Sequence, residues 1–108
     1  MQDTNQNQLD RFHSKFEYSK YTHACLKDKL RRTREKLDEA EDDLKTFNTA
    51  LLDIDVPVFY TEKLSTPVKY LEMWIQDHKN ECSAMKERLQ ELDSDMCFYA
   101  DKINLING

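Results

Sequence analysis

The sequence is poor in the two residues that most often interrupt helices. Its only glycine is Gly108, and its two prolines, Pro57 and Pro67, both lie near the middle of the chain. Phosphate-binding loops, dinucleotide-binding turns and nucleophile elbows need glycine where the backbone turns sharply or comes close to a ligand. The sequence therefore excludes all three kinds of site.

Cysteine and long apolar runs are also scarce. The three cysteines, Cys25, Cys82 and Cys97, are an odd number with no close pair, which argues against a disulfide framework. No apolar run approaches the length that spans a bilayer, and the polar start of the chain does not resemble a signal peptide. We therefore expect an intracellular protein, cytoplasmic or nuclear, that does not enter a membrane.

Charged residues are abundant in the sequence. Of 108 residues, 34% are charged and 39% hydrophobic, and the net charge is -5. This balance is typical of a chain with a narrow apolar seam and wide solvated faces, and the negative sign argues against general binding to nucleic acid or anionic lipid. The length allows one domain at most.

The first half of the chain carries a heptad stripe, in which positions three and four residues apart alternate without a skip. Most of its members are apolar, and a stripe sustained for this long predicts a coiled-coil helix. The stripe comprises Leu9, Phe12, Phe16, Ser19, His23, Leu26, Leu30, Thr33, Leu37, Ala40, Leu44, Phe47, Leu51 and Ile54.

The second half carries a similar stripe. Thr66 can cap a helix that has Pro67 at its first position, where proline is favoured. We therefore predict a frayed N-terminus over 1–5, a helix over 6–54, a connector over 55–66 and a second helix over 67–107. The second stripe comprises Val68, Leu71, Ile75, His78, Cys82, Met85, Leu89, Leu92, Met96, Tyr99, Ile103 and Ile106.

A short connector between two long helices predicts an antiparallel hairpin. With the fold point near Thr61, facing stripe residues have numbers that sum to about 122, which places His23 opposite Tyr99 and Glu41 near Lys79 or Lys86. Heptad repeats match again after a shift of seven, so sums near 115 and 129 stay open. The predicted fold is all-α, a long antiparallel two-helix coiled-coil hairpin that assembles into a four-helix bundle or a larger coiled-coil complex.

Residues that could carry chemistry do not converge. Among the histidines and cysteines only one pair, His78 and Cys82, has the spacing of three or four residues at which two side chains of one helix can reach the same metal ion, and a single pair falls short of a metal site. A two-helix hairpin also lacks a concave pocket that excludes water. We therefore expect no metal, no cofactor and no catalytic site.

The most informative residues are apolar ones that the stripes do not use, because clustered aromatic side chains mark binding surfaces. One cluster lies near the fold point, and we predict that it binds a partner. The other lies near the open end of the hairpin, where we predict partner binding or self-association, with a homodimer expected. The first cluster is Phe59, Tyr60, Tyr70, Met73 and Trp74, and the second is Tyr18, Tyr21, Phe98 and Leu105.

These features favour a non-catalytic scaffold or adaptor that mediates protein–protein assembly. Cytoskeletal, centrosomal and chromosome-associated complexes are the expected setting, because long helical rods often serve there. One alternative is a holding chaperone, since the proportions of the chain resemble those of prefoldin subunits, although the connector has room for little more than one minimal β-hairpin. A second is a helical RNA-binding arm built on the basic run from Lys27 to Lys36, which Asp28 and Glu35 interrupt.

Overall fold

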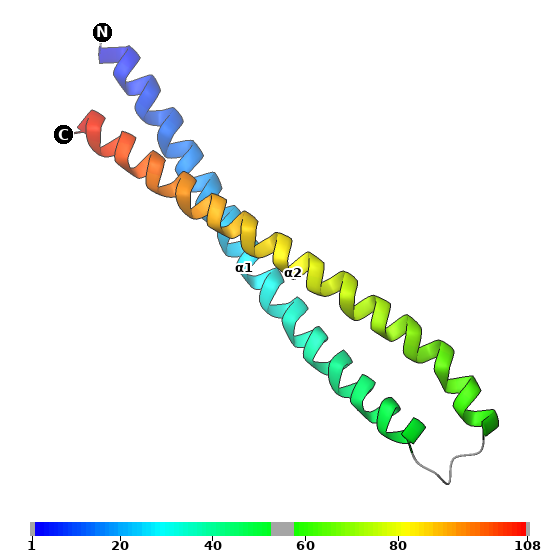
Figure 1. The fold of residues 1–108 in the computed structure, drawn as a ribbon. Helices are drawn as coiled ribbons and strands as arrows, with labels where there is room; N and C mark the ends of the chain where they lie inside the picture. The colour runs from blue at the N-terminus through cyan, green and yellow to red at the C-terminus, as the bar shows by residue number, and fades with distance from the viewer. Residues whose placement is uncertain (1, 53–57, 108) are drawn as a thin grey trace. The chain divides into compact units, whose positions relative to one another are not determined.

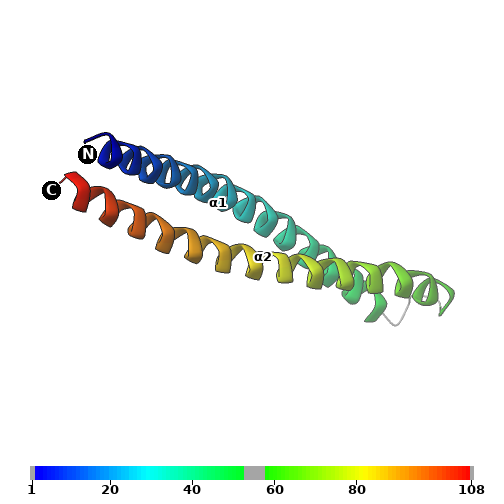
Figure 2. The same ribbon diagram turned by 90° about the horizontal axis from the view of Figure 1, so that it is seen from above.

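The structure is a computed structural model that describes the backbone of residues 2–52 and 58–107, and the side chains of residues 5–52, 62–63 and 65–107. Over these residues it consists of two long helices, α1 (Gln2–Leu52) and α2 (Val58–Asn107), which pack against each other. The helices run in opposite directions, so that the start of α1 lies beside the end of α2 (Figures 1 and 2). The predicted all-α helical hairpin is confirmed.

Local sequence explains why both segments are helical. Neither contains glycine, and both are rich in leucine, lysine and glutamate, which are strong helix formers. Side chains one turn apart also pair along the helices: Arg31 donates to Glu35 at 2.8 Å, and Gln76 donates to Asn80 at 3.0 Å. Each such pair is worth about 0.2 to 0.5 kcal/mol, so the rest of the stability comes from packing.

Burial follows the predicted stripes. All ten residues that the structure describes as buried are stripe residues, and they are Ser19, Leu30, Thr33, Leu37, Ala40, Val68, Ile75, Cys82, Met85 and Leu92. Every other stripe residue with a described side chain is half-buried except Phe47, which is 37% exposed. Ile54 lies outside the described residues. The stripes therefore form the seam between the two helices.

The chain divides into two compact units, each built from parts of both helices. Unit 1 comprises residues 1–30 and 84–108, and its most buried side chain is Leu92, at 1% exposure. Across its seam, Nε2 of His23 lies 3.0 Å from Oδ1 of Asp93, and the rings of Phe12 and Tyr99 are 6.2 Å apart.

These two contacts correct the predicted register. The residue numbers sum to 116 and 111, which fits a register near 115 with His23 opposite Leu92. A sum of 122 would place Phe12 and Tyr99 eleven residues out of step, or about 16 Å along the helix axis. The prediction that His23 lies opposite Tyr99 is therefore wrong by one heptad.

Unit 2 comprises residues 31–83, and its seam is filled by buried apolar residues such as Leu37 and Ile75. The predicted ion pair between Glu41 and Lys79 is confirmed, with Nζ of Lys79 3.2 Å from Oε1 of Glu41. The two residue numbers sum to 120, which lies between 115 and 122, so this pair alone does not establish the register. Each exposed pair of this kind contributes about 0.2 to 1 kcal/mol, so it favours the pairing without holding the unit together.

The start of α2 explains the error in register. The structure begins α2 at Val58, nine residues before the predicted start at Pro67, so that predicted start is wrong and the midpoint of the register lies before Thr61. Residues 58–66 contain no glycine or proline, and Pro67 continues the helix although it has no amide proton to donate. In the turn before it, the Ser65 hydroxyl donates to the Glu62 carbonyl at 2.7 Å.

The predicted N-terminal segment and the predicted connector also differ from the structure. The structure begins α1 at Gln2, whereas a frayed segment was predicted over residues 1–5. Of the predicted connector, residues 55–57 lie outside the described residues and the remaining positions are helical. Both helices therefore begin earlier in the chain than the candidate capping residues predict.

The position of Pro67 inside α2 can be tested by substitution. Pro67→Ala restores an amide donor and removes a ring that crowds the preceding turn, so it should stabilise the protein by up to about 3 kcal/mol. Thr66→Ala should leave stability unchanged or slightly raised. Thermal unfolding followed by circular dichroism gives both values. If α2 instead began at Pro67, Thr66→Ala would remove an N-cap and lower stability by about 1 kcal/mol, and Pro67→Ala would give no gain.

The register can be tested with the native thiol of Cys82, which is buried in unit 2. In a background with Cys25→Ser and Cys97→Ser, Thr33→Cys places a second thiol at the facing position for a sum of 115, and Ala40→Cys does so for 122. Mild oxidation should form an intramolecular disulfide in the Thr33→Cys variant only, as read by mass spectrometry with and without reductant. Ready oxidation of the Ala40→Cys variant instead would contradict the register, because the two positions are about 10 Å apart along α1.

Candidate protein-docking surface

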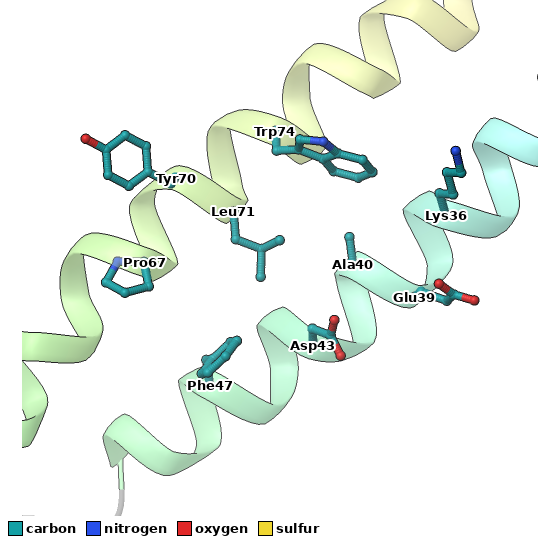
Figure 3. A pocket seen from close by; sticks show the side chains of 9 residues that line it. All are labelled: Lys36, Glu39, Ala40, Asp43, Phe47, Pro67, Tyr70, Leu71 and Trp74. Atoms are coloured by element: carbon teal, nitrogen blue, oxygen red, sulfur yellow. The ribbon is translucent and has the colours of Figure 1, made fainter.

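Unit 2 contains an open groove between its two helices, which we call the aromatic groove. Its volume is about 630 Å³. Leu71 and Trp74 point from α2 towards α1, where Ala40 and Phe47 lie opposite them, whereas Tyr70 points away from α1 (Figure 3). The groove is lined by Lys36, Glu39, Ala40, Asp43, Phe47, Pro67, Tyr70, Leu71 and Trp74.

Trp74 is held in place by its neighbour one turn along α2. Its ring stacks on that of His78, with centroids 3.8 Å apart and an angle of 22° between the planes. Nδ1 of His78 also lies 2.8 Å from the Trp74 carbonyl oxygen, so this nitrogen carries the proton and donates it. The stack and the hydrogen bond fix a half-buried indole at the edge of the groove.

The residues predicted to bind a partner near the fold point are placed differently from one another. Tyr70 and Met73 are 67% and 62% exposed, whereas Trp74 is half-buried. Tyr70 and Trp74 line the aromatic groove, and Met73 does not. The side chains of Phe59 and Tyr60 lie outside the described residues.

Unit 1 contains a second groove near the start of α1 and the end of α2, which we call the basic groove. It has a volume of about 500 Å³, with Phe12, Leu105 and Ile106 as its apolar surface. Its polar lining is Gln8, Arg11, Lys15 and Lys102. Leu105, predicted as part of the open-end cluster, is 74% exposed here.

The other residues of the open-end cluster are all exposed but do not form one site. Tyr18 lines a cavity of about 300 Å³ together with Ser19 and Leu92. Phe98 packs edge to face on Tyr99, with ring centroids 5.4 Å apart. Tyr21 lies on another part of α1, and each of these side chains therefore has its own surroundings.

Tyr21 interacts with the exposed thiol of Cys25 one turn along α1. The hydrogen bond between these side chains, then the charge of the cysteine and slight burial, raise the pKa of the Tyr21 phenol. Tyr21 therefore stays an uncharged aromatic side chain at neutral pH. It can contribute apolar contact area, and its hydroxyl already has an internal partner.

Sequence reasoning missed the charged residues around the basic groove. The run from Lys27 to Lys36 is the more conspicuous basic feature, whereas Arg11, Lys15 and Lys102 are spread over the two helices, with the first two four residues apart on one face of α1. In the structure Nζ of Lys15 lies 5.8 Å from the centre of the Tyr99 ring, and Nζ of Lys102 lies 5.4 Å from that of Phe98. A search for cations on the same helix face as the exposed aromatic residues would have found them.

Over the residues that the structure describes, no three His, Cys, Asp or Glu side chains are grouped so that they could hold a metal ion. The three cysteines are free thiols, of which only Cys82 is buried. No described helix is long and apolar enough to cross a membrane.

Comparisons of the chain with models of protein families, with curated proteins and with solved structures found no match. Any indication of function therefore comes from the geometry of the two grooves and from the residues that line them.

Proposed function

We propose that this protein is a non-catalytic coiled-coil scaffold or adaptor that mediates protein–protein assembly. The observation that carries the proposal is the aromatic groove, where exposed Tyr70 lies beside half-buried Trp74. Tryptophan and tyrosine are enriched among residues that dominate binding energy, especially where a pocket excludes water around them. A helix of a partner laid in this groove would cover the apolar surface that the seam leaves open.

The thin seam supports the same proposal. The two helices bury one stripe of side chains each, and Ser19 and Thr33 place polar groups among them. Packing against further helices, in a four-helix bundle or a larger coiled-coil complex, would bury the flanking residues and add to stability. Cytoskeletal, centrosomal or chromosome-associated complexes in the cytoplasm or nucleus are the setting that we propose for such a module.

The two alternatives would use different surfaces of the protein. A holding chaperone would bind many unfolded chains through its exposed apolar residues, without fixed stoichiometry. An RNA-binding arm would use the basic run, in which Glu35 pairs with Arg31 at 2.8 Å, and its affinity would fall steeply with salt. A defined complex with one folded partner separates the scaffold from both.

The proposal can be tested with the double variant Tyr70→Ala/Trp74→Ala. We expect the wild-type protein to capture a small set of proteins at fixed stoichiometry from cells that express it, and the variant to lose them. Quantitative mass spectrometry of the captured proteins, followed by light scattering of the purified complex, measures both properties.

Two further variants make this experiment decisive. Lys69→Ala/Gln76→Ala changes two exposed residues of α2 outside the groove and should retain the partners. Tyr70→Arg alone, at a side chain that is 67% exposed, tests the groove if the double variant loses helicity. Retention of the same partners by every groove variant would contradict the proposal, and capture of unfolded chains alone would favour the chaperone.

A further inference from the structure

The basic groove of unit 1 carries charge of one sign around an apolar surface. Arg11, Lys15 and Lys102 line it, and among the described residues no carboxylate does. Over the described residues, none of these three cations forms an ion pair, and the contacts of Lys15 and Lys102 are with aromatic rings. An occupant of this groove must therefore bring both apolar side chains and carboxylates.

The aromatic groove of unit 2 has the opposite character. Glu39 and Asp43 line it with a single cation, Lys36, so its charged lining is negative on balance. Its apolar surface is also larger, because Phe47, Leu71 and Trp74 all contribute to it (Figure 3). The occupant that it fits brings apolar side chains and cations.

Each groove therefore has the chemistry that the other one requires. Two basic grooves placed face to face would bring six cations together, which costs free energy, whereas a basic groove placed on an aromatic groove brings opposite charges into contact. Exposed Leu105 in one groove and exposed Tyr70 in the other supply apolar area on both sides. A second copy of the same chain offers both surfaces.

We infer that two copies of this protein associate reciprocally, with unit 1 of each copy docked on unit 2 of the other. Both grooves of both copies are then filled, and the assembly closes as a two-fold dimer, because each contact occurs twice. The inference rests on the proposed scaffold function and specifies self-association as the use of its grooves. The charged residues set the pairing of unlike units, and the apolar residues supply most of the buried area.

Charge reversal tests this pairing. One variant is Arg11→Glu/Lys15→Glu and the other is Glu39→Lys/Asp43→Lys, and all four side chains are exposed. Each variant alone should raise the dissociation constant of the dimer at least about tenfold, because it places like charges opposite each other. The chain carrying all four substitutions, and an equimolar mixture of the two variants, should dimerise again. Sedimentation velocity over a range of concentrations gives the dissociation constants.

The control matched to Arg11→Glu/Lys15→Glu is Lys20→Glu/Lys86→Glu, which makes the same change in net charge at exposed residues of unit 1 that lie outside the grooves. This control should dimerise like the wild-type protein. Circular dichroism confirms that each variant is helical. A wild-type protein that is monomeric throughout, single variants that dimerise normally, or a fourfold variant that does not recover would overturn the inference. A monomer that still captures a folded partner through Tyr70 and Trp74 would leave the proposed function standing, so the two failures can be told apart.

Discussion

The burial of one narrow apolar seam is the interaction on which the rest of this structure depends. Isolated helices in water gain little from each additional residue, and sequences this rich in charge need tertiary packing to stay helical. All the residues described as buried lie on the two stripes, with Leu92 the most enclosed. Over the described residues, no fully buried side-chain nitrogen or oxygen lacks a hydrogen-bond partner.

The narrowness of this seam also creates the surfaces that we assign to assembly. Because only every third or fourth residue is used to join α1 and α2, the neighbouring positions face solvent along the edges of the seam. In unit 2 these edges carry Trp74 and Tyr70, and in unit 1 they carry Lys15 and Lys102. The narrow seam therefore leaves one groove with a negative lining in unit 2 and one with a positive lining in unit 1.

Sequence predicted the seam well because its signal is local and repeats many times. It failed on the register, since two heptad repeats match again at every shift of seven. Contacts in the structure, such as those of His23 with Asp93 and of Phe12 with Tyr99, distinguish 115 from 122. It also failed on the start of α2, because Pro67 is favoured at a first helical position, whereas in the structure the helix continues through it.

The candidate site was predictable in part. Tyr70, Tyr18 and Leu105 stood out as apolar residues beyond the seam, and the structure does expose them. Which of them share a groove, and which charges surround it, depends on how the two helices pair. The grouping of Arg11 with Lys102 is a consequence of that pairing, so sequence spacing alone could not give it. The stacking of Trp74 on His78 lies within α2, between residues four apart.

The dependence of both helices on the seam is tested most directly by truncating leucines of opposite exposure. Leu92 is 1% exposed and Leu52 is 82% exposed. Denaturant unfolding followed by circular dichroism should show that Leu92→Ala lowers the free energy of unfolding by about 2 to 5 kcal/mol, while Leu52→Ala changes it by less than about 0.5 kcal/mol. Equal and small effects of the two substitutions would mean that the helices do not need each other, which would contradict this account.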